Sequence, residues 1–61
     1  MSKDWGSPGG NVVRWNASAG SYQAIFYAIG DRKLMVMSFD SRDEAIGALK
    51  AFEAAGMVAP R

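Results

Sequence analysis

The chain contains no cysteine and no histidine among its 61 residues. Without thiols and imidazoles it cannot form disulfides, hold a metal through thiolate or imidazole ligands, or use a cysteine nucleophile or a histidine base. The sequence also has no glycine loop between a strand and a helix that could cradle a phosphate, and it has no set of metal ligands. We therefore expect no enzyme activity, no cofactor and no small-molecule substrate.

Long apolar runs are missing as well. No stretch approaches the roughly 20 residues of a membrane span, and the start, Met1-Ser2-Lys3-Asp4-Trp5-Gly6, lacks the apolar region of a signal peptide. Seven basic and six acidic residues leave a net charge of +1, which favours no particular partner. These absences predict a cytoplasmic protein that does not contact a membrane.

An apolar share of 49% nevertheless excludes disorder of the whole chain. Glycines and a proline between Ser2 and Gly10 predict a flexible N-terminal arm over residues 1–10. Residues 11–56 are then a single domain, and residues 57–61 are a short C-terminal tail. A core this small gives little stability by itself, so homodimerisation would be stabilising.

Three β-branched and aromatic runs predict strands, at residues 11–15, 22–29 and 33–39. Gly30-Asp31 predicts the turn between the last two, which form a hairpin. The turn length stays open, and it decides which side chains share a face. A two-residue turn places Ile25, Tyr27, Leu34 and Val36 together, whereas a three-residue or bulged turn groups Ala24, Phe26, Leu34 and Val36.

Ser41 and Glu44 form a capping box, which predicts the start of a helix. Gly56 predicts its end through a left-handed C-cap. Apolar residues between them fall on one stripe, which we expect to pack on the sheet: Ala45, Ile46, Leu49 and Phe52. The predicted fold class is α+β, a three-stranded antiparallel β-sheet meander with one C-terminal α-helix packed on one face.

This order of elements resembles the plant ethylene-response-factor DNA-binding domain and its relatives in phages and mobile elements, including the arm-binding domains of tyrosine integrases. The resemblance covers residues 12 to about 55, and its most specific piece is Ser38-Phe39-Asp40-Ser41-Arg42-Asp43-Glu44-Ala45. It implies that the sheet lies in the major groove of duplex DNA and reads bases with the face opposite the helix.

Carried over by position, the resemblance implies five DNA-contacting residues: Arg14, Asn16, Tyr27, Lys33 and Met35. Arg14 and Lys33 match basic residues of the family. Asn16, Tyr27 and Met35 stand where the family usually has Arg, Arg and Trp, which removes guanine readers and phosphate neutralisers.

The same alignment places Ala24, Phe26, Leu34 and Val36 under the helix. It leaves a second apolar set on the outer face, which we interpret as a partner or dimer surface: Ile25, Tyr27, Met35 and Met37. The N-terminal arm or the tail could instead fold over this set and complete one core.

Two functions are therefore expected. The first is a small DNA-binding accessory or regulatory protein of phage or mobile-element type, with duplex DNA as its partner. The second is a protein-binding module that uses the apolar outer face. Such a module could be a phage-encoded inhibitor of a host protein or a homodimer-forming domain.

Overall fold

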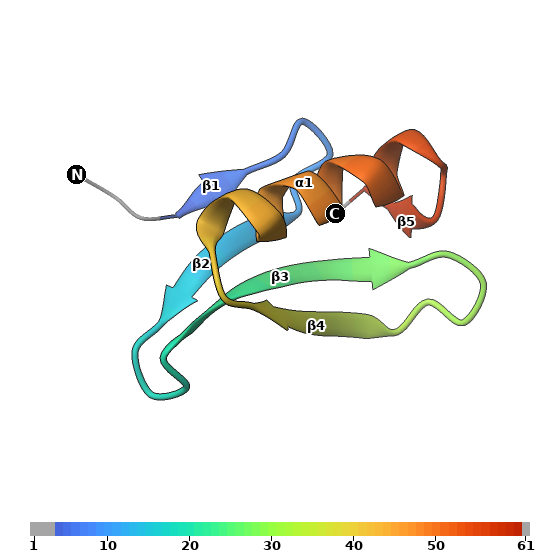
Figure 1. Cartoon of the computed structure of the whole chain (residues 1–61). Coiled ribbons are helices and arrows are strands. Elements are labelled where there is room, and N and C mark those ends of the chain that lie inside the picture. Colours follow the sequence, from blue (N-terminus) through green and yellow to red (C-terminus); the bar gives the residue numbers. More distant parts are fainter. Residues whose placement is uncertain (1–3, 61) are drawn as a thin grey trace.

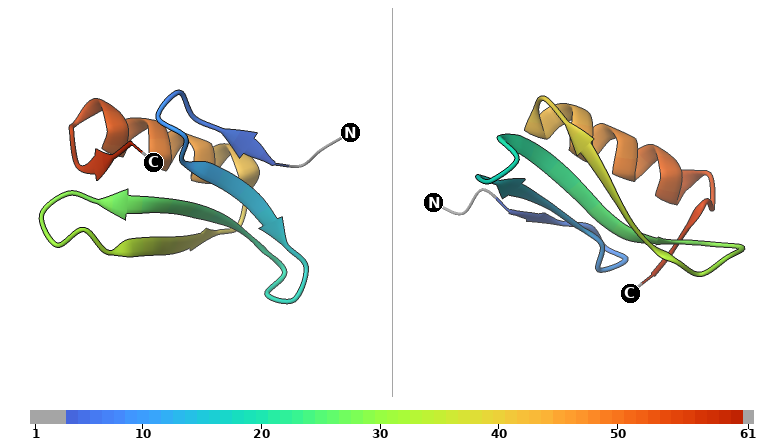
Figure 2. Two further views of the ribbon diagram at one scale, coloured as in Figure 1. Left: turned by 180° about the vertical axis from the view of Figure 1, so that it is seen from behind. Right: turned by 90° about the horizontal axis from the view of Figure 1, so that it is seen from below.

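The computed structural model describes residues 4–60, and it is an α+β domain in which one helix packs on an antiparallel sheet (Figure 1). The elements are β1 (Trp5–Gly6), β2 (Val12–Asn16), β3 (Ser21–Ala28), β4 (Leu34–Phe39), α1 (Arg42–Ala54) and β5 (Val58–Ala59). The strand order is β1-β2-β3-β4, and β5 pairs with β3. Seen from below, α1 lies along one face of the sheet (Figure 2).

The expected meander of β2, β3 and β4 forms the centre, but the sheet has five strands rather than three. Trp5 pairs with Val13, so β1 lies in the segment that was expected to be a flexible arm. Val58 pairs with Ala28, so β5 lies in the segment that was expected to be a plain tail. Both corrections have one physical cause: Trp5 packs against the core and Val58 is buried in it. The parts of the two ends that the structure describes thus widen the sheet, and within residues 4–60 they do not fold over its outer face.

A polar contact ties these two ends together. Asn11 is fully buried, and its Nδ2 donates to Glu53 Oε2 at 2.9 Å and to the Ala59 carbonyl at 3.3 Å. Ser7 Oγ donates to the same Glu53 oxygen and accepts from the Asn11 backbone N–H at 3.1 Å. We call Ser7, Asn11 and Glu53 the polar latch. It joins the β1–β2 hairpin to the last turns of α1 and to β5.

Both predicted helix ends are confirmed. Ser41 is the N-cap, and its hydroxyl accepts from the Glu44 N–H at 3.1 Å. At the other end Gly56 has φ 72°, its N–H donates to Glu53 O at 3.1 Å, and the Met57 N–H donates to Phe52 O at 2.8 Å. This pair of bonds is the Schellman motif, which needs a left-handed residue at the glycine position.

The core lies between α1 and the sheet. Ala45 and Leu49 of the predicted stripe are fully buried, while Ile46 and Phe52 pack at its margin. The Phe52 ring meets the Phe26 ring with centroids 5.8 Å apart and an interplanar angle of 48°, a tilted geometry that aromatic pairs favour. The buried side chains that the sheet supplies are Val13, Ala24, Phe26 and Val58.

We expect Glu53→Ala to lower the free energy of unfolding by about 1–3 kcal/mol, because it leaves the buried Asn11 amide without its closest acceptor. Urea denaturation followed by circular dichroism measures the change. Glu44→Ala, in the exposed first turn of the same helix, is the matched control and should cost less than about 1 kcal/mol. Equal losses in the two variants would contradict the latch.

Candidate interaction surface

The β3–β4 hairpin has a single register, in which Ile25 pairs with Val36 and Tyr27 with Leu34. This is the pairing expected of a two-residue turn, although the connection is longer. The Ala28 N–H donates to Lys33 O at 3.1 Å, so residues 29–32 form the loop. The longer loop keeps the pairing because it extends the two-residue turn by one residue on each side.

This register corrects the faces that the resemblance implied. Met35 pairs with Phe26 and Met37 with Ala24, so both methionines lie on the helix side of the sheet. Leu34 and Val36, which were expected under the helix, lie on the outer face. A shift of one residue in the pairing exchanges the two faces of a strand. The alignment to the resembled family implied a pairing of β3 with β4 that was shifted by one residue.

The outer face, opposite α1, divides into a polar and an apolar half. Paired residues form rows across the strands, because directly opposed side chains point to the same side. The polar rows are Asn16–Ser21 and Arg14–Gln23–Ser38, and the apolar rows are Val12–Ile25–Val36 and Ala59–Tyr27–Leu34. We call the residues of the two apolar rows the apolar half.

The apolar half is open to solvent. Leu34 and Val36 are each 52% exposed and Tyr27 is 37% exposed. Within residues 4–60 no helix or strand covers this face, and Figure 2 shows α1 on the other side. Contiguous exposed apolar side chains of this kind mark interaction surfaces in small domains.

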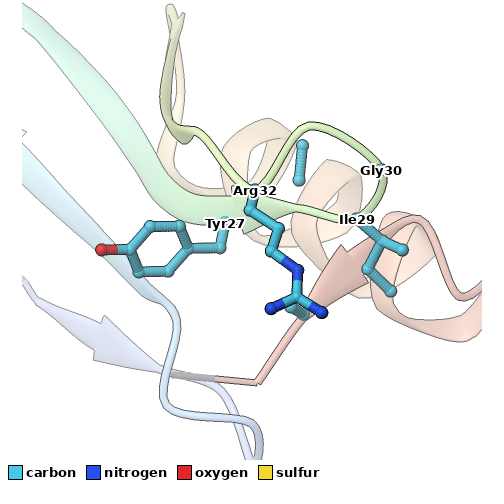
Figure 3. A pocket seen from close by; sticks show the side chains of 6 residues that line it. Tyr27, Ile29, Gly30 and Arg32 are labelled. Carbon is cyan, nitrogen blue, oxygen red and sulfur yellow. The ribbon is translucent and has the colours of Figure 1, made fainter.

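A shallow depression of about 320 Å³ adjoins the apolar half at the tip of the hairpin. Tyr27, Ile29, Gly30 and Ala59 line it, and Arg32 forms part of its wall. The Arg32 side chain extends from the loop toward β5 (Figure 3). Arg32 has φ 57°, a left-handed conformation that is uncommon outside glycine. The depression therefore combines an apolar lining with one guanidinium group.

The structure separates the residues that were expected to contact DNA. Arg14, Asn16 and Tyr27 share the outer face, whereas Met35 lies on the opposite one. Lys33 precedes β4, and the strand alternation places it on the side of Met35.

The expected partner face also divides, because Ile25 and Tyr27 lie outside while Met35 and Met37 lie toward the helix. Leu34 and Val36 take the place of the methionines on the outer face. The sequence contained a signal for Leu34 and Val36, since the two-residue turn groups them with Ile25 and Tyr27.

Charge on the outer face is sparse. Its strand residues include Arg14 and no carboxylate. Extending the β1–β2 register by one residue places Asp4 opposite Arg14, so an acidic residue neighbours the arginine. Among residues 4–60 no cluster of metal-ligating side chains is present, and α1 is too short and too polar to cross a membrane.

Comparison with protein-family models, with curated proteins and with solved structures finds no significant match. The surface of the chain is therefore the feature from which its function can be inferred.

The two faces of β4 should respond differently to charge. We expect Leu34→Glu to change the free energy of unfolding by less than about 1 kcal/mol, because the side chain is half exposed. Met37→Glu should cost about 1–3 kcal/mol more, since it places a carboxylate against the core. Urea denaturation of both variants tests the register, and the reverse order would contradict it.

Proposed function

We propose that the chain is a protein-binding module that captures its partner with the apolar half of the outer sheet face. The observation that supports this proposal is the exposure of Leu34, Val36 and Tyr27 side by side on a face that α1 leaves open. Burying such side chains contributes about 25 cal/mol per Å² of apolar surface removed from water. A polar, well-hydrated ligand would gain little from this contact.

The surroundings of the apolar half indicate the chemistry of the partner. The depression beside Tyr27 can take an apolar side chain, and the Arg32 guanidinium at its wall can pair with a neighbouring carboxylate. Aromatic residues and arginine are the groups that most often dominate binding energy at protein interfaces. The favoured partner is a folded protein or segment with an exposed apolar residue next to an acidic one.

Capture with matched variants tests this function. Immobilised chain is incubated with lysate of the source organism, with and without nuclease treatment, and bound proteins are quantified by mass spectrometry. We expect Leu34→Glu to reduce a specific bound protein at least tenfold, because the new charge lies in the apolar half. Met57 is 57% exposed and lies outside the outer face, so Met57→Glu should retain the bound protein. Equal retention by both variants, or loss on nuclease treatment alone, would contradict the proposal.

Duplex DNA is the second candidate. The polar half of the outer face favours it, since Arg14, Gln23 and Ser38 form one row of hydrogen-bonding side chains across three strands. Such a row could follow a groove, as the sheet of the resembled family does. One strand arginine with Asp4 opposite it supplies little phosphate neutralisation, so we rank DNA below a protein partner.

A duplex titration separates the two candidates. If DNA is the partner, binding at about 50 mM salt should fall steeply as salt is added. Arg14→Ala should then weaken it, while Met35→Ala, on the opposite face, should not. Fluorescence anisotropy with a labelled duplex measures the salt dependence and the effect of each of the two variants. Absence of binding at this salt concentration would exclude the DNA candidate and leave the protein partner.

A further inference from the structure

The far edge of β4 is a second open surface, separate from the outer face. Among residues 4–60 no strand pairs with it, and Figure 1 shows β4 at the border of the sheet. The bond from Ala28 N to Lys33 O fixes the hydrogen-bonding phase of the hairpin. Since backbone groups alternate in direction, Leu34, Val36 and Ser38 point their N–H and C=O groups away from β3.

This edge lacks the features that normally prevent pairing. Natural edge strands carry a lysine, a proline or a bulge, or are covered. The six residues of β4, Leu-Met-Val-Met-Ser-Phe, include no charge and no proline, and they pair with β3 without interruption. An uncharged edge with three pairs of outward backbone groups is a template for one more strand.

We infer that the edge of β4 pairs antiparallel with β4 of a second copy, with Val36 opposite Val36 on a twofold axis. In one continuous sheet, residues whose N–H and C=O groups point away from β3 must lie opposite residues of the second copy whose backbone groups do the same. Val36 opposite Val36 and Leu34 opposite Ser38 is the alignment that uses all three outward residues of each copy. Neighbouring alignments leave at least one of them without a partner.

The side chains fit this twofold arrangement. Met35-Val36-Met37 reads the same in both directions. The pairing therefore places Met35 against Met37 of the second copy on the helix side, and valine against valine on the outer side. Apolar cross-strand pairs of this kind stabilise a sheet, and the flexible thioethers can adapt to each other.

The charges at the two ends of β4 favour the antiparallel direction. Lys33 precedes the strand and Asp40 follows it. Antiparallel pairing brings the basic end of one copy to the acidic end of the other, whereas parallel pairing would place like charges together. A second copy supplies this complementary edge, and an unrelated partner would have to match both the apolar pattern and the charges.

Sedimentation velocity of the purified chain tests the association without any other partner, so its outcome is independent of the function proposed above. We expect the sedimentation coefficient to rise from that of a monomer to that of a dimer between about 10 µM and about 1 mM, the range of small interfaces. Ser38→Pro removes an outward N–H. It should move the monomer–dimer transition to an at least tenfold higher chain concentration while the circular dichroism spectrum stays unchanged. A monomer throughout the range would overturn the inference.

Cysteine cross-linking tests the register, and the chain has no cysteine of its own. Paired Cα atoms on the axis lie about 5.5 Å apart, within disulfide range. The Cα atoms of the two Leu34 residues would lie roughly 13 Å apart along the strands.

Oxidised Val36→Cys should therefore form a covalent dimer on a non-reducing gel, and Leu34→Cys, equally exposed in the monomer, should remain a monomer. Equal cross-linking of both variants, or none, would overturn the arrangement even if the chain dimerises.

Discussion

The register of the β3–β4 hairpin is the constraint on which the surfaces of this molecule depend. Because side chains alternate across a strand, this one alignment decides which residues pack under α1 and which meet solvent. With Phe26 opposite Met35, the methionines join the core side, while Leu34 and Val36 become the exposed residues. The same alignment also decides which backbone groups of β4 point outward. Face and edge therefore follow from one choice of pairing.

Elements whose signals are local could be predicted from the sequence. The capping serine, the apolar stripe and the terminal glycine each act within a few residues, and the structure has the helix where they indicate. The hairpin was predictable for the same reason. Its register was not, because the loop contains Arg32 in a left-handed conformation that its residue type does not indicate. The resemblance to a known family replaced that missing information with a pairing shifted by one residue.

The ends of the chain were missed because their stability comes from distant contacts. β1 and β5 have two residues each, too few for any periodic pattern. Trp5 and Val58 gain their burial from the core, and the polar latch spans 42 residues between Asn11 and Glu53. β2 and β5 pair with the same side of β3, and Asn11 holds the two where they adjoin. Composition carries no information on strand pairing, so it shows only a glycine-rich start and a short tail.

Within residues 4–60, the ends widen the sheet and α1 packs on the opposite side, so neither shields the outer face. The apolar row Val12–Ile25–Val36 runs across the sheet and ends at the free edge of β4. Twofold pairing of that edge would continue the row directly into the same row of the second copy. The outer surface would then carry one apolar band with an Arg14 on either side of it, and both copies would present it to the same partner. Edge pairing would thus bury the open edge of β4 and enlarge the binding face without covering it.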